Sequence, residues 1–463
     1  MIESILINLM KKDIQIALLM AASLFMEILD GTIVTTALPR MTVDFSVNST
    51  SAALLVSTYL ITVAIFIPLS GWMAQRFGKK RIWLIAVAGF TLSSLACAIA
   101  PNFGFLLGMR VLQGISGALM TPTARLIVLE KTPSNLLLKM TSYLVWPALL
   151  APAIAPLIGG VLITYLNWHW IFLINLPVGA MIFFIGIYLI PQDVIERVTR
   201  FDWIGFLQIA LSSGFLLTGA EIACRQGAGA LRFGVLLLVL GLIMLGMFIQ
   251  HIRSVSNPLF SIKALRFPSY RISQTGGFIL WLSVGAMPYL LTLYLQTVFD
   301  WSAVKAGSYI MFIFIGNIGI KPFTTPIIKT IGYKGALESA FGMVLLSAVA
   351  LAFVTPQTVG IVIMVLALIS GVGRSLALTS YNGLSFADVA PIDRNSANTL
   401  TSVTQSMAQG LGVSLVSIFV RILQLFMPAQ AAYGYAFIAL GLLMIYPIIE
   451  TACLPKDIGA NTL

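Results

Sequence analysis

Two carboxylates, Glu27 and Asp30, interrupt an apolar stretch that runs from Ile14 to Pro39. A charged group at membrane depth costs about 3 kcal/mol on insertion scales, so such groups usually face the protein interior and serve a function. Residues three apart lie on one face of a helix, and two buried acids on one face repel each other when both are charged. Repulsion raises the proton affinity of at least one acid, so the pair predicts a proton-binding site.

Arg110 lies beside glycines in a later apolar stretch. Because arginine keeps its charge in proteins, a buried Arg110 needs an acidic or polar partner. Glu27 and Asp30 are the nearest candidates, and a cation beside Asp30 would oppose the effects of burial and of the second acid on its proton affinity. The alternative is structural: Arg110 and Asp30 form an ion pair that only supports the fold, and Glu27 only adjusts Asp30.

Further residues within apolar stretches could line a cavity that holds an amphipathic compound, namely Trp146, Trp281, Tyr289, Lys321 and Arg374. Most aromatic residues in such a chain pack in the interior or anchor at the membrane interface. Lys321 could instead extend its amine to the interface. Arg374 lies deeper inside its stretch, which favours a cavity role, and both cations would favour anionic cargo.

The composition identifies an integral membrane protein. Of the 463 residues, 59% are hydrophobic and only 9% are charged, against about 25% charged in an ordinary soluble domain. The net charge of +11 comes from basic residues in short loops, where they contact anionic headgroups and set topology. No basic stripe with interleaved aromatic residues indicates nucleic-acid binding.

No motif in the sequence points to a metal, a cofactor or an enzyme. The cysteines and histidines are scattered, at Cys97, Cys224, Cys453, His169 and His251, so they predict neither a disulfide framework nor a zinc site. No phosphate-binding loop suggests ATP as the energy source.

Fourteen apolar runs are long enough to cross a membrane as helices. They lie near residues 14–38, 53–74, 82–100, 103–127, 139–163, 169–190, 203–222, 231–251, 271–298, 305–328, 335–354, 358–381, 397–424 and 432–453. If the N-terminus is cytoplasmic, most basic residues between the runs fall on the cytoplasmic side, as expected for membrane proteins. The sequence therefore predicts fourteen spans with both termini in the cytoplasm.

The two halves of the chain share a weak internal repeat. Segments 75–81 and 329–334 each place a glycine between basic residues, after the second and the tenth apolar run. Transporters are often built from such repeats, with the substrate site between them. We expect a six-helix bundle over residues 1–190, a linker with two additional spans over 191–269, and a second six-helix bundle over 270–463.

Four segments carry a family resemblance. Leu29–Pro39 resembles the first-helix signature of the fourteen-span drug:proton antiporters in the major facilitator superfamily. Gly71–Leu84 resembles the superfamily's loop signature, and Leu106–Ala118 its fourth-span signature. Pro156–Gly160 resembles the antiporter signature of the fifth span. The resemblance implies the major-facilitator fold and a role for Arg110 in proton relay.

The resemblance also implies a cytoplasmic gate loop and a helix that packs closely or pivots. The gate loop comprises Gly71, Arg76, Gly78, Lys79 and Lys80, and the antiporter-motif helix carries Pro156, Gly159 and Gly160. We expect Gly71 and Gly78 to permit a tight helix–loop–helix turn. The chain departs from the signatures at Gln75, where an acid is usual, and at Ala151 and Ala155, where glycines are usual. The first departure puts the usual gate ion pair in doubt.

Together these features predict a bacterial inner-membrane antiporter that exports small amphipathic compounds in exchange for protons by alternating access. Its expected partners are the cargo, protons and the lipid bilayer, and we expect a monomer without cofactors. An alternative cargo is a specific metabolite, such as a metal chelate, a siderophore or an amino-acid derivative. A membrane sensor or a channel is a further alternative, but a sensor needs a soluble output module and a channel needs no coupled acid.

Overall fold

The computed structural model describes residues 2–47, 49–132, 136–192, 200–224, 228–255, 258–455 and 457–462. Within these ranges the chain forms sixteen α-helices, a few 3₁₀ turns and no strand. The predicted all-α class is confirmed.

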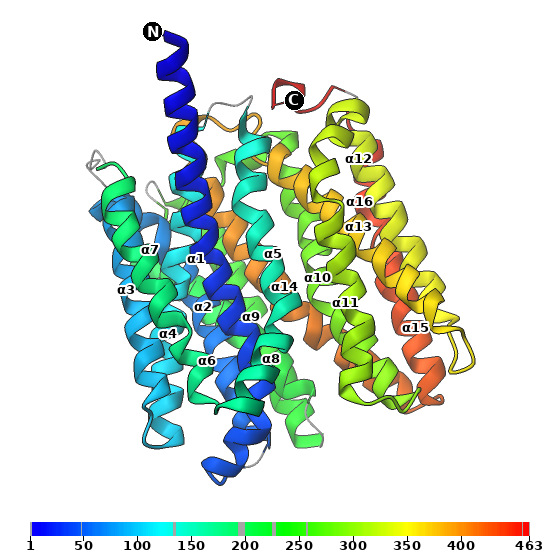
Figure 1. The fold of residues 1–463 in the computed structure, drawn as a ribbon. Coiled ribbons are helices and arrows are strands. Elements are labelled where there is room, and N and C mark those ends of the chain that lie inside the picture. The colour runs from blue at the N-terminus through cyan, green and yellow to red at the C-terminus, as the bar shows by residue number, and fades with distance from the viewer. Residues whose placement is uncertain are drawn as a thin grey trace.

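The first bundle is coloured from blue to blue-green in Figure 1. It contains α1 (Ile2–Asp44), α2 (Ser49–Phe77), α3 (Lys79–Ala98), α4 (Phe103–Lys131), α5 (Leu137–Tyr165), α6 (His169–Leu173) and α7 (Asn175–Leu189). Asn102 caps α4 by accepting a hydrogen bond from the Phe105 N–H at 2.9 Å. α5 bends by 45° at Pro156, which lacks the N–H of a continuous helix.

The second bundle is coloured from green to red in Figure 1. It contains α10 (Pro268–Thr297), α11 (Ala303–Gly319), α12 (Lys321–Ala352), α13 (Gly360–Leu384), α14 (Arg394–Gln424), α15 (Ala429–Leu442) and α16 (Ile445–Ala452), with 3₁₀ turns at Lys263–Arg266, Pro391–Asp393 and Ala460–Thr462. Each bundle has its own buried apolar core, around Trp83 and Phe90 in the first and around Tyr294 and Phe437 in the second.

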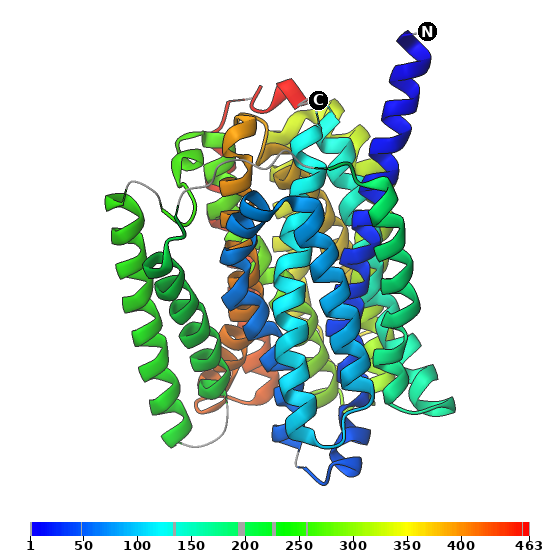
Figure 2. The same cartoon turned by 90° about the vertical axis from the view of Figure 1, so that its left-hand side faces the viewer.

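Two further helices, α8 (Trp203–Cys224) and α9 (Ala228–Ser254), form a hairpin at the left in Figure 2. Small residues let the two helices cross closely, since a Cβ at Gly234 would lie 2.7 Å from the carbonyl oxygen of Gly219. α8 also packs against α2 and α14. The hairpin therefore contacts one helix from each bundle.

In the part of the chain that the structure describes, twelve helices are long and apolar enough to cross a membrane, or thirteen if the bent α5 is included. The difference from the fourteen predicted spans lies at α11 and α12. The predicted span 305–328 is divided at Ile320, because Pro322 begins a new helix. α12 then continues to Ala352 with a break at Gly332, whose φ of 72° is not helical.

The N- and C-terminal ends of the described chain lie at the same end of the molecule, at the top of Figures 1 and 2. We call this the terminal end. The break at Gly332 also lies there, because the next residue, Tyr333, contacts Thr462 through their hydroxyl groups at 2.7 Å, and Lys334 donates to the carbonyl of Leu454 at 2.9 Å. When both ends of a chain lie on the same side of a membrane, the chain crosses that membrane an even number of times.

Candidate functional site

Asp30 on α1 and Arg110 on α4 form an ion pair in the middle of the first bundle. Arg110 Nη1 donates to Asp30 Oδ2 at 2.6 Å, and both side chains are completely buried. Arg110 Nε donates to the Leu55 carbonyl of α2 at 3.1 Å, and the guanidinium lies 4.3 Å from the ring centroid of Tyr59. Arg110 therefore has the acidic partner that a buried arginine requires.

A polar shell surrounds the carboxylate of this pair. Asp30 Oδ1 accepts hydrogen bonds from Gln113 Nε2 at 3.0 Å and from Asn175 Nδ2 at 2.7 Å. Gln113 and Asn175 also donate to Ser94 Oγ, at 2.7 and 3.2 Å. Gln113 Oε1 in turn accepts from Arg110 Nη1 at 2.7 Å. Five buried polar residues from α1, α3, α4 and α7 thus form one connected network.

Sequence reasoning did not single out Gln113, Ser94 or Asn175 as site residues. Gln113 follows Arg110 by three residues, so it lies on the same helix face, and that spacing could have identified it. Asn175 begins α7 within the sixth predicted span. Its partner Ser94 gives no comparable sign, because a serine in an apolar helix usually bonds to its own backbone.

Glu27 lies outside this network. It is 9% exposed and accepts a hydrogen bond from the Thr121 hydroxyl of α4. Glu27 Oε1 and the Tyr59 hydroxyl border Gly117, each 3.2 Å from the position that a Cβ would occupy there. The structure therefore pairs Arg110 with Asp30 alone and gives Glu27 a separate, less enclosed position.

Gly159 and Gly160 differ in the structure, although sequence reasoning treated them alike. A Cβ at Gly159 would lie 2.2 Å from Thr36 Oγ1 and 3.0 Å from Ile33 Cγ1, so α5 and α1 meet closely there. Gly160 has open space beside it. Pro156 and Trp146 belong to α5, but their side chains lie outside the described part of the structure.

The two glycines of the gate loop have different roles. Gly78 has a φ of 88°, a conformation that favours glycine, and it forms the turn between α2 and α3. The expectation that Gly71 also serves this turn is wrong, because Gly71 lies inside α2 and faces α14 of the second bundle. A Cβ there would lie 2.3 Å from Thr399 Oγ1, and Asn395 Nδ2 donates to the Gly71 carbonyl at 3.1 Å.

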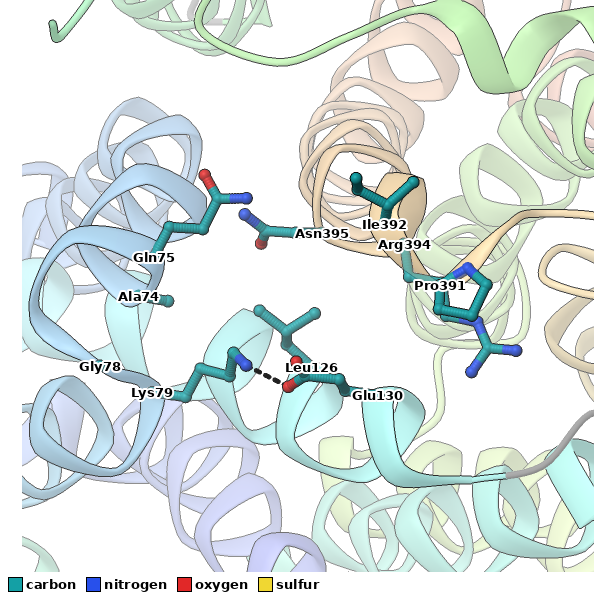
Figure 3. Close-up of a pocket in the computed structure, with 10 residues that line it drawn as sticks. All are labelled: Ala74, Gln75, Gly78, Lys79, Leu126, Glu130, Pro391, Ile392, Arg394 and Asn395. Atoms are coloured by element: carbon teal, nitrogen blue, oxygen red, sulfur yellow. Dashed lines mark hydrogen bonds and ion pairs between the residues drawn. The ribbon is translucent and has the colours of Figure 1, made fainter. Parts of the chain in front are cut away.

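Basic residues of the gate loop contact other helices of the first bundle. Lys79 forms an ion pair with Glu130 of α4, drawn in Figure 3, and Lys80 donates to the Ile187 carbonyl of α7 at 2.6 Å, while Arg76 is exposed. The side chain of Gln75 points across the pocket in Figure 3 toward Asn395 of α14. Two uncharged side chains therefore face the pocket at the place where the usual signature has an acid.

The two bundles are joined at the terminal end by side chains of α14. Arg394 Nη1 donates to the Leu129 and Thr132 carbonyls at the end of α4, at 2.7 and 3.1 Å. Asn398 Nδ2 donates to the Pro122 carbonyl of α4 at 2.8 Å. These residues were not predicted, but the polar run that opens the thirteenth predicted span, Arg394–Gln405, could have indicated them. The contacts of Arg394 and Asn398 with the first bundle are hydrogen bonds to backbone carbonyls.

The predicted cavity residues of the second bundle are enclosed. Lys321 is 8% exposed and donates to Thr379 Oγ1 at 2.7 Å, so it does not extend to the membrane interface. Arg374 is 2% exposed, and its Nη2 donates to the carbonyl and to the hydroxyl of Ser283 at 2.9 and 3.0 Å. Trp281 and Tyr289 are half-buried and pack against apolar clusters.

The chain is similar to known proteins over almost its whole length. The family model of the Major Facilitator Superfamily matches residues 20–417. A relative from Yersinia enterocolitica, named "Putative multidrug resistance protein MdtD", is 30% identical over 451 residues, which cover 96% of this chain and 95% of the relative. The protein of the same name from Escherichia coli K12 is 30% identical over 455 residues, with the same coverage.

Two solved structures resemble the fold at 14% sequence identity. The human organic anion transporter MFSD10 (TETRAN) matches with a TM-score of 0.72 and covers 95% of this chain and 99% of its own. The proton:xylose symporter XylE matches with a TM-score of 0.67 and covers 97% of both chains. At this identity the likeness concerns the fold alone.

Proposed function

Because the chain belongs to the major facilitator superfamily, and is thus a multi-pass membrane transporter rather than an enzyme, we propose that it exports small amphipathic compounds across the bacterial inner membrane in exchange for protons. The observation that carries this proposal is the ion pair of Asp30 and Arg110, which is sealed inside the first bundle and whose hydrogen bonds join α1, α2, α4 and α7. The name of the MdtD relatives supports export of drug-like compounds.

The proposed topology has fourteen spans. α11 has only 17 residues, about 26 Å at 1.5 Å per residue, which is short of the hydrocarbon core. Joined to residues 321–331, it becomes a complete crossing that ends at Gly332, and residues 333–352 form the next. The terminal end carries the basic gate loop, so we assign it to the cytoplasm. Residues 1–190 and 270–463 are then the two bundles, and 191–269 holds the inserted pair, in a monomer.

Protonation of Asp30 is the proposed coupling step. A proton on either carboxyl oxygen neutralises the acid and displaces one of the three donors that meet it, namely Arg110, Gln113 and Asn175. The donors come from α4 and α7, so the protonation state of Asp30 favours one arrangement of these helices over another. Cargo and proton need not touch, since each need only favour a different conformation of the transporter.

Glu27 is proposed as the second acid of the pathway. It is more accessible than Asp30 and is held by a single threonine hydroxyl. This position suits a group that binds a proton before Asp30 changes its protonation state. It equally suits a group that binds the positive end of a cargo molecule. The α14 contacts would keep the cytoplasmic side shut while the opposite side opens.

Everted inner-membrane vesicles test the exchange. Respiration acidifies their lumen, and an antiporter that moves cargo inward releases protons and reduces the pH gradient. We expect at least one of three probes, ethidium, chloramphenicol and 1-naphthalenesulfonate, to reduce the gradient in vesicles that contain the protein and not in vesicles that lack it. The E27Q variant should weaken the response. A gradient that no probe changes would contradict the proposal.

A further inference from the structure

We propose that the second bundle recognises an acidic group on the cargo, with Arg374 as its main contact and Lys321 as a second cation. The inference rests on the proposed transport function and specifies its cargo as anionic or zwitterionic. It comes from an asymmetry between two corresponding arginines: Arg110 of the first bundle is paired with a buried acid, and Arg374 of the second is not.

The two arginines occupy corresponding places. Arg110 lies on α4, the fourth crossing of the first bundle, and Arg374 lies on α13, the fourth crossing of the second when α12 is divided at Gly332. Each bonds to the first helix of its own bundle. Their partners, Asp30 on α1 and Ser283 on α10, both lie fourteen residues before the last residue of the helix. The second bundle thus has a neutral serine where the first has a carboxylate.

Arg374 lacks an acidic partner in the described structure. Both of its hydrogen bonds go to Ser283, and its buried Nε has no partner among the described residues. Lys321 likewise bonds to a neutral hydroxyl. Among the described carboxylates, Glu27 and Asp30 are buried as whole residues, and both belong to α1. The half-buried Glu450 of the second bundle accepts a hydrogen bond from Thr275. A buried cation that has only neutral partners is poorly compensated, and an anion placed beside it would supply the missing charge.

Both cations belong to helices at the boundary of the bundles. α13, which carries Arg374, and α12, which begins with Lys321, each contact α5 of the first bundle. Transporters of this kind hold cargo between their two halves. A carboxylate, sulfonate or phosphate group could therefore reach Arg374 when the bundles part, with Arg374 Nε as a free donor.

Binding to the purified full-length protein in detergent tests this inference without a proton gradient. The probes are benzenesulfonate, benzenesulfonamide and phenyltrimethylammonium, which share a ring and carry negative, zero and positive charge. At constant ionic strength, benzenesulfonate should raise the melting temperature in a saturable way, and the other two should not. The R374Q variant should bind benzenesulfonate at least about tenfold more weakly, because a charged hydrogen-bond donor is lost, and K321Q should weaken binding less.

Two pairs of variants control for folding, namely S283D with S283N and R374Q with R253Q. S283D supplies the internal acid that the first bundle has, so it should abolish benzenesulfonate binding, whereas the similarly sized S283N should retain it. R253Q removes an exposed cation at the end of α9 and should leave binding unchanged. Equal responses to all three probes, no response to benzenesulfonate, or binding that R374Q and S283D leave intact would overturn the inference. A failure of proton coupling alone would leave benzenesulfonate binding in place.

Discussion

At the scale of single residues, the first bundle contains a charge pair whose members depend on each other. Asp30 and Arg110 have no contact with solvent, and each compensates the cost of burying the other. Removing one partner of such a pair leaves an isolated charge and costs about 3–5 kcal/mol, whereas removing both is far less harmful. Arg374 differs, because its removal isolates no described carboxylate.

This difference predicts unequal effects of two similar substitutions. R110M should lower the melting temperature of the purified protein strongly, since it isolates Asp30, and the double variant D30N/R110M should recover much of the loss. R374M should have a much smaller effect. The measurement is thermal unfolding in detergent for R110M, D30N, D30N/R110M, R374M and the wild type. Additive losses in D30N/R110M would contradict the pairing.

The single sequence predicted the chemistry of these residues better than their contacts. The cost of burying charge was enough to identify Asp30, Glu27 and Arg110 as inward-facing. It could not show that Asp30 binds Arg110 while Glu27 binds Thr121. Both acids lie on one face of α1, and how α1 is rotated about its axis against α4 decides which of them meets Arg110. Ser94 and Asn175 join the network through tertiary packing, which no spacing along the chain encodes.

At the scale of helices, the length and position of most elements followed from apolar runs and their breaks. The exception was α11 with α12, where Pro322 starts a helix before Gly332 ends the crossing. Pro322 and Gly332 both interrupt helices and lie close together in the chain, so the sequence alone does not show which of them ends the membrane crossing. The sequence also does not show which neighbouring helix a glycine faces. Gly71 was therefore assigned to a turn, although it faces Thr399 of the other bundle.

Close packing of α1 against α5 predicts a contrast between neighbouring glycines. G159A places a methyl group against Thr36, and overpacking of this kind typically costs about 1–3 kcal/mol, so transport and melting temperature should both fall. G160A should resemble the wild type, because the space beside Gly160 is open. T36A should partly rescue G159A by removing the obstructing hydroxyl. Equal effects of G159A and G160A in a transport assay would contradict the packing.

At the scale of the whole molecule, the described conformation is closed at the terminal end. α14 makes the closing contacts, to Gly71 of α2 and to Leu129, Thr132 and Pro122 of α4. All of these acceptors are backbone carbonyls, so these contacts do not depend on a charge at position 75. This arrangement explains how the chain can carry Gln75 in place of the usual acid.

The proposed fourteen-span topology predicts opposite accessibility for two loop positions. In a variant without native cysteines, I331C should react with a membrane-impermeant thiol reagent in everted vesicles, because Ile331 is 50% exposed beside the turn at the terminal end. D300C, in the loop between α10 and α11, should react in intact spheroplasts. The opposite pattern, or reaction of both positions from one side, would rule out the division of α12 at Gly332.

Closure by α14 predicts the effect of removing its arginine. R394A deletes the bonds to the end of α4, so the gate should open more often. The reporter S402C is nearly isosteric and sacrifices no described hydrogen bond, since Ser402 Oγ is buried without a partner there. In everted vesicles, its labelling should be several-fold faster with R394A than with R253A, which alters an exposed arginine. Equal labelling rates would show that Arg394 does not hold the gate.

Asp30 is proposed to couple the proton gradient to transport, and an assay in proteoliposomes separates this role from cargo binding. The assay compares gradient-driven accumulation of the most active vesicle probe with counterflow exchange of the same probe, which needs no net proton movement. D30N also leaves Arg110 without its acid and should be less stable, so equal amounts of folded protein are compared. We expect D30N to lose gradient-driven accumulation and to retain counterflow, since cargo binding and alternation need no net proton movement. Gradient-driven accumulation at the wild-type rate in D30N would contradict the account.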